Sequence, residues 1–213
     1  MHRHDPYRAR RFEPSRGDVI GAAMTALRKW DEPRPVRLRV EDFLGLNESD
    51  ALQALPKVEL MEGAIVAMNS QWAQHARVKT RLTLVLAAEV VRVMPGFEVL
   101  SEVGVAIPPE NFPEPDIAVT SFQGGREAVP VETVALVVEV ADTTLRYDLD
   151  RKMRIYAQGG VPEYWVVDVE GRVIHQMWAP ARDTYAERRE VAFGEVLEAA
   201  AIAGLKVETE GLS

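Results

Sequence analysis

One segment constrains the fold of this chain more than any other. Residues 134–141, VALVVEVA, form a nearly unbroken apolar run with a single charged residue. A run of this kind is typical of a strand that is buried on both faces at the centre of a sheet. Such a strand needs a layer of structure on each side of the sheet. The predicted fold class is therefore α/β with mixed α+β character: a mixed central β-sheet flanked by helices.

The rest of the chain supplies the other elements. Residues 72–94 keep a mostly helical apolar period, and residues 148–158 fit a second helix that ends at a Gly-Gly pair. Further strands are predicted from short apolar runs and turn signals in residues 57–68, 97–107, 115–120, 163–169, 172–178 and 184–191.

The N-terminal 35 residues have a different character. Residues 1–17 are rich in Arg and Pro and predict a disordered tail, and a helix fits residues 18–30 or so. The domain organisation predicted is thus an N-terminal extension, 1–35, followed by one domain, 36–213. An apolar content of 47% suits one domain with a substantial core.

Charge and composition narrow the function classes. The net charge is −8, so a nucleic-acid partner would have to meet a local basic patch against an unfavourable overall field. No apolar run is long enough to span a bilayer, and the basic start lacks the apolar stretch of a signal peptide, which predicts a cytoplasmic protein. The absence of cysteine excludes thiolate chemistry and Cys-ligated zinc.

Glu139 is the charged residue inside the apolar strand. Burying an unpaired ionised carboxylate costs several kcal/mol or more, so Glu139 needs a cation, a set of hydrogen-bond donors or a proton. A metal ion would meet this need. A buried Glu–Arg pair, or a position at an exposed end of the strand, are the structural alternatives.

A second carboxylate, Asp116, follows Pro115 at the start of a predicted strand. Proline cannot donate to a β-ladder, so Pro115 belongs at the beginning or edge of a strand. Asp116 is therefore expected at the rim where that strand enters the sheet. A simple turn or capping role is the alternative.

A lysine, Lys152, lies near the middle of the apolar arc of the predicted helix 148–158. At about 100° per residue, Leu149, Tyr156 and their apolar neighbours point the same way as Lys152. Snorkelling, or an i,i+4 pair with Asp148, are the alternatives to a functional role. Two carboxylates and an inward lysine together predict a hard-cation site suited to phosphoryl chemistry.

These residues resemble the PD-(D/E)xK nuclease superfamily, and the fuller pattern resembles its Uma-two family of "putative restriction endonucleases". The resemblance covers roughly residues 36–207 and rests on VELMEG (58–63), His75, PDIAV (115–119), VVEV (137–140), DLDRKMRIY (148–156) and GVPEYWVVD (160–168). It implies a restriction-endonuclease-like fold, Mg²⁺ or Mn²⁺ held by Asp116 and Glu139, and hydrolysis of DNA.

The sequence departs from the general motif at Ala141, where the superfamily has its lysine. Lys152 matches the lysine that this family supplies from the following helix. Glu59 matches an early glutamate of the family, which implies that it completes the metal shell. The alternative for Glu59 is a position on the exposed surface of a strand. His75 is expected more as a capping or packing histidine than as a base. Tyr156 is expected to pack, with a hydroxyl contact to the site. Tyr164 and Trp165 are expected to be core aromatics.

Two functions from different classes follow. The first is an endonuclease that uses Asp116, Glu139, Lys152 and Glu59. The second is a nuclease-fold binding or regulatory module without turnover, which Ala141 and the acidic net charge favour. RNA is an alternative substrate. A homodimer is an alternative to a monomer, because nucleases that cut both strands are often dimers. Phosphate-binding loops, nucleophile elbows and HExxH zinc motifs are absent from the sequence.

Overall fold

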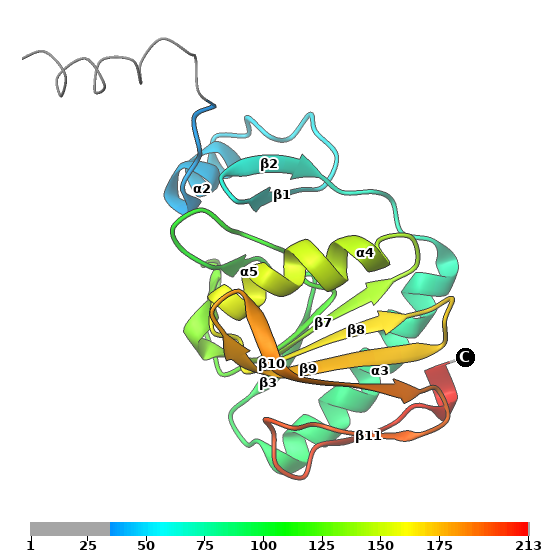
Figure 1. Ribbon diagram of the computed structural model, residues 1–213. Helices are drawn as coiled ribbons and strands as arrows, with labels where there is room; N and C mark the ends of the chain where they lie inside the picture. The colour runs from blue at the N-terminus through cyan, green and yellow to red at the C-terminus, as the bar shows by residue number, and fades with distance from the viewer. Residues whose placement is uncertain (1–34, 213) are drawn as a thin grey trace, which may run out of the picture. The chain divides into compact units, whose positions relative to one another are not determined.

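A six-stranded mixed sheet forms the centre of the computed structural model, which describes residues 35–212 (Figure 1). The sheet confirms the predicted fold class. Its strands run in the order β10-β9-β8-β7-β5-β3, and only the central pair β7–β8 is parallel. Their bounds are β3 Glu98–Ser101, β5 Ile117–Thr120, β7 Val134–Ala141, β8 Glu163–Asp168, β9 Val173–Ala181 and β10 Thr184–Ala192.

Three two-stranded sheets and two short 3₁₀ helices complete the strand regions. The sheets pair β1 Val58–Met61 with β2 Ala64–Ala67, β4 Val105–Ala106 with β6 Val129–Pro130, and β11 Val196–Glu198 with β12 Lys206–Glu208. The 3₁₀ helices are Val131–Thr133 and Glu210–Leu212. The helices are α2 Val40–Glu48, α3 Ala73–Val93, α4 Leu145–Tyr147 and α5 Met153–Gln158.

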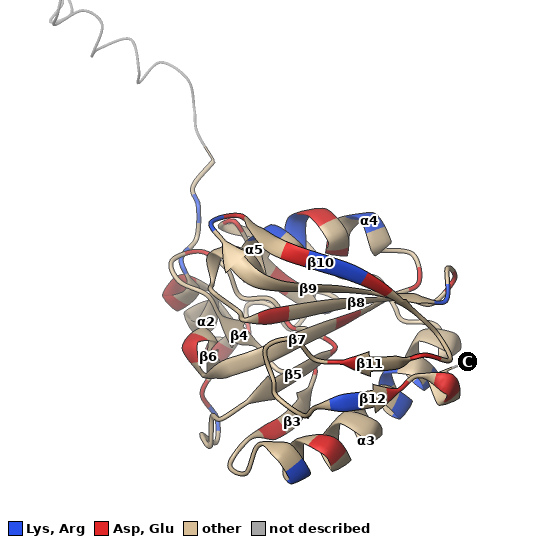
Figure 2. Cartoon of the chain, turned by 60° about the horizontal axis from the view of Figure 1, so that its bottom comes forward, with Lys and Arg blue, Asp and Glu red and all other residues tan. Residues whose placement is uncertain are grey.

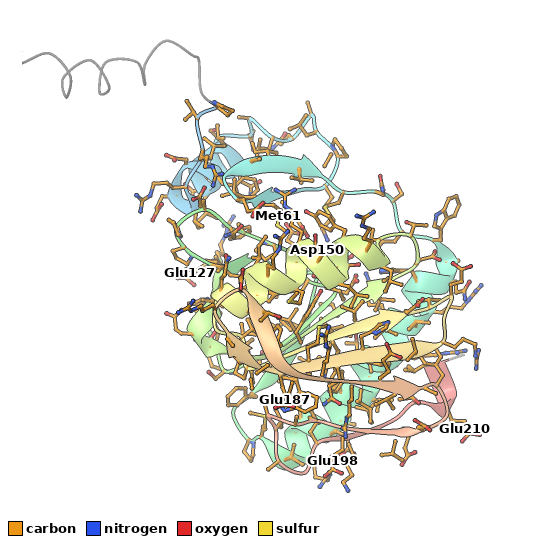
Figure 3. All side chains as sticks on the ribbon, in the orientation of Figure 1. Met61, Glu127, Asp150, Glu187, Glu198 and Glu210 are labelled. Atoms are coloured by element: carbon orange, nitrogen blue, oxygen red, sulfur yellow. The ribbon has the colours of Figure 1, made fainter. Side chains whose placement is uncertain are left out.

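The central strands are buried on both faces, as the apolar run predicts. On one face α3 and the β11–β12 hairpin cover Val138 and Trp165, which belong to the first core cluster. On the other face the α4–α5 segment covers Val137 and Tyr164 in a second cluster, to which Met61 of β1 also belongs. Figure 3 shows Met61 and Glu198 on opposite sides of the sheet. Tyr164 and Trp165 are fully buried core aromatics, as expected.

The predicted helix 148–158 is part of a longer helical segment. It begins at α4, passes through a π-helical stretch, Asp148–Lys152, and continues as α5. An extra residue in a helical turn changes the direction of the side chains that follow, and such π-bulges are frequent at functional sites. Here the π-helical stretch contains two buried charged residues, Asp148 and Lys152.

Some element predictions were wrong or incomplete. The strand expected over 97–107 is divided into β3 and β4, because Glu102 between them adopts a positive φ of 53° that interrupts extended backbone. α2 and the β11–β12 hairpin were not predicted. The expected tail and helix within residues 1–35 lie outside the described residues, apart from Pro35. In residues 35–212, no helix is long and apolar enough to cross a membrane.

Candidate active site

Asp116 lies at the rim of the sheet, directly before β5. Ile117 pairs with Val138 of the antiparallel strand β7, so the same register brings Asp116 beside Glu139. Asp116 Oδ2 accepts a hydrogen bond of 2.8 Å from the backbone N–H of Val140, the residue after Glu139. This register and this hydrogen bond place the two carboxylate-bearing residues at neighbouring positions of the sheet.

Side chains from α3 and from the loop before it hold the Asp116 carboxylate in place. His75 Nε2 lies 3.1 Å from Oδ2, and Gln71 Nε2 donates to Oδ1 at 3.1 Å. Lys79 Nζ lies 3.5 Å from Oδ1. Burial raises the pKa of Asp116, but the hydrogen bond and charge of His75, the Val140 N–H and Lys79 together outweigh it, so the pKa is lowered and the carboxylate is ionised.

Glu139 is buried in the central strand, with 4% of its surface exposed. Its Oε1 accepts a hydrogen bond of 2.9 Å from Lys152 Nζ and one of 2.8 Å from the Tyr156 hydroxyl. Both structural alternatives for Glu139 are therefore wrong, because its ion-pair partner is a lysine and its side chain is not exposed. The expected contact of the Tyr156 hydroxyl with the site is present.

Lys152 points inward, as the helical period predicts, and only 2% of its surface is exposed. Its ammonium lies 2.9 Å from Glu139 Oε1 and 3.3 Å from Glu59 Oε1. The side chain does not snorkel to solvent, and its ion pairs are with Glu139 and Glu59 rather than with Asp148. The lysine therefore joins the strand β1 to the centre of the sheet.

Glu59 is the third carboxylate of this group. It is 1% exposed, so the expected alternative of a surface strand residue is wrong. Its Oε1 accepts hydrogen bonds from Lys152 and from the backbone N–H of Glu114, the latter at 3.0 Å. Its Oε2 is buried without a hydrogen-bond partner among the residues described. A buried oxygen in this state has acceptor capacity for a cation or an ordered water.

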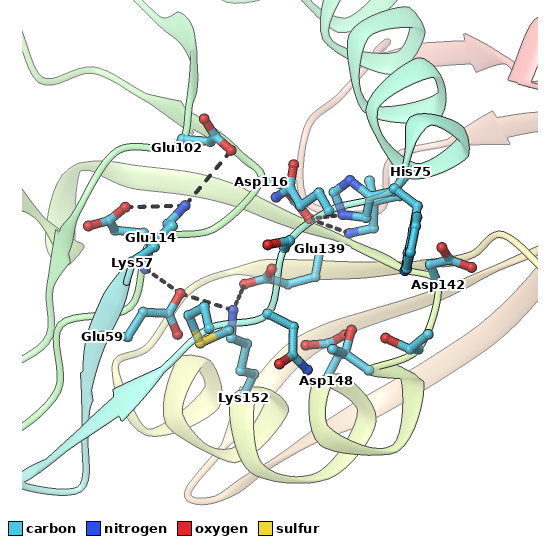
Figure 4. A pocket seen from close by; sticks show the side chains of 18 of the residues that line it. Lys57, Glu59, His75, Glu102, Glu114, Asp116, Glu139, Asp142, Asp148 and Lys152 are labelled. Carbon is cyan, nitrogen blue, oxygen red and sulfur yellow. Dashed lines mark hydrogen bonds and ion pairs between the residues drawn. The ribbon is translucent and has the colours of Figure 1, made fainter. Parts of the chain in front are cut away.

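These side chains line one cleft of about 430 Å³ (Figure 4). The cleft is strongly acidic, because its lining contains seven carboxylates and two lysines. The carboxylates are Glu59, Glu102, Glu114, Asp116, Glu139, Asp142 and Asp148, and the lysines are Lys57 and Lys152.

The excess of negative charge changes the acidity of the buried groups. Burial raises the pKa of Glu139, and although Lys152 opposes this, the charges of Asp148, Asp116 and Glu59 raise it further. Burial alone would lower the pKa of Lys152, but the surrounding carboxylates, Glu139 first, raise it instead. The ammonium is therefore firmly protonated, while one lysine does not neutralise the carboxylates around it. A divalent cation in the cleft would relieve this repulsion.

The donor set fits a hard cation that keeps part of its hydration. In residues 35–212, no three or more His, Asp or Glu side chains are already grouped as metal ligands. Mg²⁺ is commonly bound through one or two carboxylates, with waters and substrate phosphates filling the other positions. Asp116 and Glu139 can supply those two carboxylates, and the unpartnered Glu59 Oε2 adds acceptor capacity nearby.

Sequence reasoning missed Gln71, Lys79 and Asp148 as members of this site. His75 and Lys79 are four residues apart on α3, so they share a helix face. That spacing is a signal from which Lys79 could have been found once His75 was placed. Gln71 lies in the loop before α3, where no period applies. The ring of His75 contacts the Asp116 carboxylate. The expectation of a capping or packing histidine therefore did not include its main polar partner.

Replacing Asp148 with asparagine should reduce the loss of folding stability that occurs as pH rises. Burial raises the pKa of Asp148 from 3.8 to about 6, although Lys152 and a hydrogen bond from Thr144 oppose this effect. Because the folded state holds this proton more tightly than the unfolded state, stability is lost as pH rises from about 3.8 to about 6. Asparagine keeps an acceptor for Thr144 and removes the titration.

The measurement is a series of thermal melts in EDTA between pH 4 and pH 8. We expect the melting temperature of Asp148→Asn to rise relative to the original protein as pH increases through this window. A constant difference across the window would show that the titration of Asp148 is not perturbed. Asp150→Asn, an exposed residue of the same π-helical stretch, is the matched control.

Comparison with known proteins places the chain in a family. The family model described as "Putative restriction endonuclease", Uma2, matches residues 40–210. Among solved structures, a crystal structure from Anabaena variabilis titled as a putative nuclease belonging to DUF820 has a TM-score of 0.60 at 16% identity, covering 84% of this chain and 97% of that chain. No curated protein matches the sequence. The structural likeness supports the fold alone, and the family model covers most of the chain: the chain belongs to the Uma2 family of restriction-endonuclease-like proteins.

Proposed function

We propose that this protein is an endonuclease that hydrolyses phosphodiester bonds with Mg²⁺ or Mn²⁺ as cofactor. DNA is the proposed substrate, and RNA is the alternative. The observation that carries the proposal is the convergence of Asp116 and Glu139 at one cleft, with the Lys152 ammonium 2.9 Å from Glu139. Membership of the Uma2 family supports the same class of reaction.

Asp116 and Glu139 would hold the cation. When bound, a divalent cation supplies Lewis-acid stabilisation of phosphate charge and makes hydroxide available near neutral pH. Asp116 suits this role because its carboxylate is ionised and fixed by the Val140 N–H and His75. Glu139 suits it because repulsion from neighbouring carboxylates would be relieved on binding a cation.

Lys152 would stabilise negative charge that develops on the phosphate. A buried, protonated ammonium is already oriented by Glu139 and Glu59, so little reorganisation is needed during the reaction. Tyr156 and Glu59 act as positioning residues, since each contacts Glu139 or Lys152 through a buried hydrogen bond. Asp116, Glu139 and Lys152 would thus act together on one phosphodiester group.

Mn²⁺ should stabilise the folded protein measurably. A ligand at about 100 times its Kd that binds only the folded state adds roughly 2.7 kcal/mol, or about 5–10 °C in melting temperature for a chain of this size. We expect this shift at pH 7.5 and its loss in Asp116→Asn and Glu139→Gln. An equal shift in both variants would mean that Mn²⁺ binds at other carboxylates. Glu187→Gln, on the edge strand β10, is the control.

The direct test of the proposed function is a cleavage assay. Purified protein is incubated with plasmid, single-stranded DNA and RNA in Mg²⁺, Mn²⁺ or EDTA. Cleavage that requires metal and disappears in Glu139→Gln supports the nuclease. Binding of nucleic acid without cleavage in any metal would favour the second candidate, a non-catalytic module, to which Ala141 in the place of the superfamily lysine points.

A further inference from the structure

Trp72 is a large aromatic side chain at the mouth of the acidic cleft. It directly precedes α3 and is 70% exposed, although it lines the same cleft as the buried residues Asp116 and Glu139. It is the only Trp, Tyr or Phe lining this cleft within residues 35–212. An isolated exposed apolar residue is common, but a flat ring beside a polar reaction site is suited to stack on a planar ligand.

A second groove continues from the cleft. The two share four lining residues, Met68, Asn69, Thr143 and Thr144, so they form one continuous depression. Their charges are opposite. Where the cleft is acidic, the charged residues of the groove are three arginines and one carboxylate: Arg146, Arg151, Arg154 and Asp150. Figure 2 shows both basic and acidic residues on the α4–α5 segment.

The arginines of this groove are available to an anion to different degrees. Arg146 is exposed and forms no ion pair with any residue in the described range 35–212. Arg154 pairs with Asp150 at 3.3 Å, but the two side chains are 45% and 66% exposed, and pairs at such exposure are weak. Arg151 is fixed by Glu62 at 3.0 Å and by the carbonyl of Met61. Arg146 and Arg154 are therefore the side chains free to meet phosphates.

The depth of the reaction site distinguishes the forms of nucleic acid that could reach it. Glu59, Asp116, Glu139 and Lys152 are exposed by only 1–6%. The phosphates of a stacked duplex lie on a rigid outer surface, and one of them does not turn inward toward buried residues unless the duplex is distorted. A single strand can turn one phosphate inward while its unstacked base finds an aromatic partner.

We propose that the cleft binds unpaired nucleotides, with the base next to the reacting phosphate stacked on Trp72 and the backbone continuing along Arg146 and Arg154. The choice of nucleic acid as ligand rests on the proposed nuclease function. The preferred substrate is accordingly a single strand, or an unpaired segment of a longer molecule, of DNA or RNA. The groove supplies the local basic surface that a chain of net charge −8 needs for such a partner.

The test measures binding separately from cleavage. Full-length Glu139→Gln in EDTA is titrated into fluorescein-labelled oligo(dT), oligo(U) and an oligo(dA)·oligo(dT) duplex of equal length, and anisotropy gives each Kd. We expect the single strands to bind at least about tenfold more tightly than the duplex, because one base–aromatic stack is worth roughly that factor or more. Adding Trp72→Ala to the Glu139→Gln variant should remove the preference for single strands over the duplex. Adding Trp72→Phe instead should retain most of that preference.

The arginines are tested through the salt dependence of the same Kd. Removing one phosphate contact with Arg146→Ala should lower the slope of log K against log salt by about 0.7 for a single strand. Arg188→Ala on the exposed face of β10 is the charge-matched control and should leave the slope unchanged. Equal affinity for duplex and single strand, or Trp72→Ala binding as tightly as its parent, would overturn the inference.

The two proposals fail in different ways. If the original protein cleaves DNA with metal but Trp72→Ala binds and cleaves single strands normally, the nuclease stands and the stacking role is wrong. If single strands bind through Trp72 but no metal supports cleavage, the binding site stands and the nuclease is wrong.

Discussion

Glu139→Gln is expected to reduce metal-dependent cleavage by about three orders of magnitude while the protein remains folded. A catalytic metal contributes several kcal/mol of charge stabilisation, and each 1.4 kcal/mol or so is a factor of ten in rate. Glutamine keeps an oxygen that can accept the hydrogen bonds of Lys152 and Tyr156, so the local packing is preserved. The readout is the single-turnover cleavage rate in Mg²⁺ and in Mn²⁺.

The melting temperature of Glu139→Gln in EDTA distinguishes a metal ligand from a structural ion-pair partner. The raised pKa of Glu139 means that the ionised carboxylate is unfavourable in the metal-free protein. The Glu139→Gln variant should therefore be as stable as the original protein, or more stable, in EDTA at pH 8. A large fall in melting temperature in EDTA would instead identify Glu139 as a structural partner of Lys152. Glu163→Gln, a buried glutamate on β8 that contacts Trp165 and Gln176, is the control for removing a structural carboxylate.

Lys152→Met is expected to reduce cleavage by at least about a hundredfold and to leave a metal site in place. Loss of one oriented electrostatic stabiliser typically costs this factor. Methionine keeps much of the apolar stem and the helix propensity, so the variant isolates the charge. Unchanged turnover would show that the lysine has no catalytic role, which would favour another cation, such as Lys79, at the reacting phosphate.

The same variant should be less stable without metal. Lys152 is the ion-pair partner of both buried glutamates, and leaving buried charges unpaired costs about 3–5 kcal/mol. This loss should diminish as pH falls, because Glu139 then takes up a proton. Activity is therefore compared well below the melting temperature of the variant. A loss of stability that is independent of pH would point to packing rather than charge.

Much of the fold followed from the sequence because its central elements have strong periods. The strand β7 was predicted with both of its ends, since an apolar run between polar residues has few alternatives. α3 was predicted to within one residue at each end. α2 was missed because its apolar stripe, Val40, Phe43 and Leu44, spans little more than one helical turn and gives a weak signal. The short strands of the C-terminal hairpin give an equally weak signal.

The sequence indicated four residues of the candidate site but few of the contacts among them: Asp116, Glu139, Lys152 and Glu59. The cost of burying Glu139 and the helix face of Lys152 brought these two residues together on physical grounds. The sequence did not reveal that Lys152 also pairs with Glu59, because that contact joins residues 93 positions apart. Nor did it reveal the π-helical stretch that contains both Asp148 and Lys152, because a single widened turn leaves the apolar pattern nearly regular.

The most direct test of the central claim is the position of a bound metal. Crystals grown or soaked with Mn²⁺ are measured at a wavelength where manganese scatters anomalously. We expect an anomalous peak roughly 2–2.6 Å from carboxylate oxygens of both Asp116 and Glu139, with Lys152 still beside Glu139. A peak only at exposed carboxylates outside the cleft, or none at a concentration that saturates the thermal shift, would contradict a metal site built from these two residues.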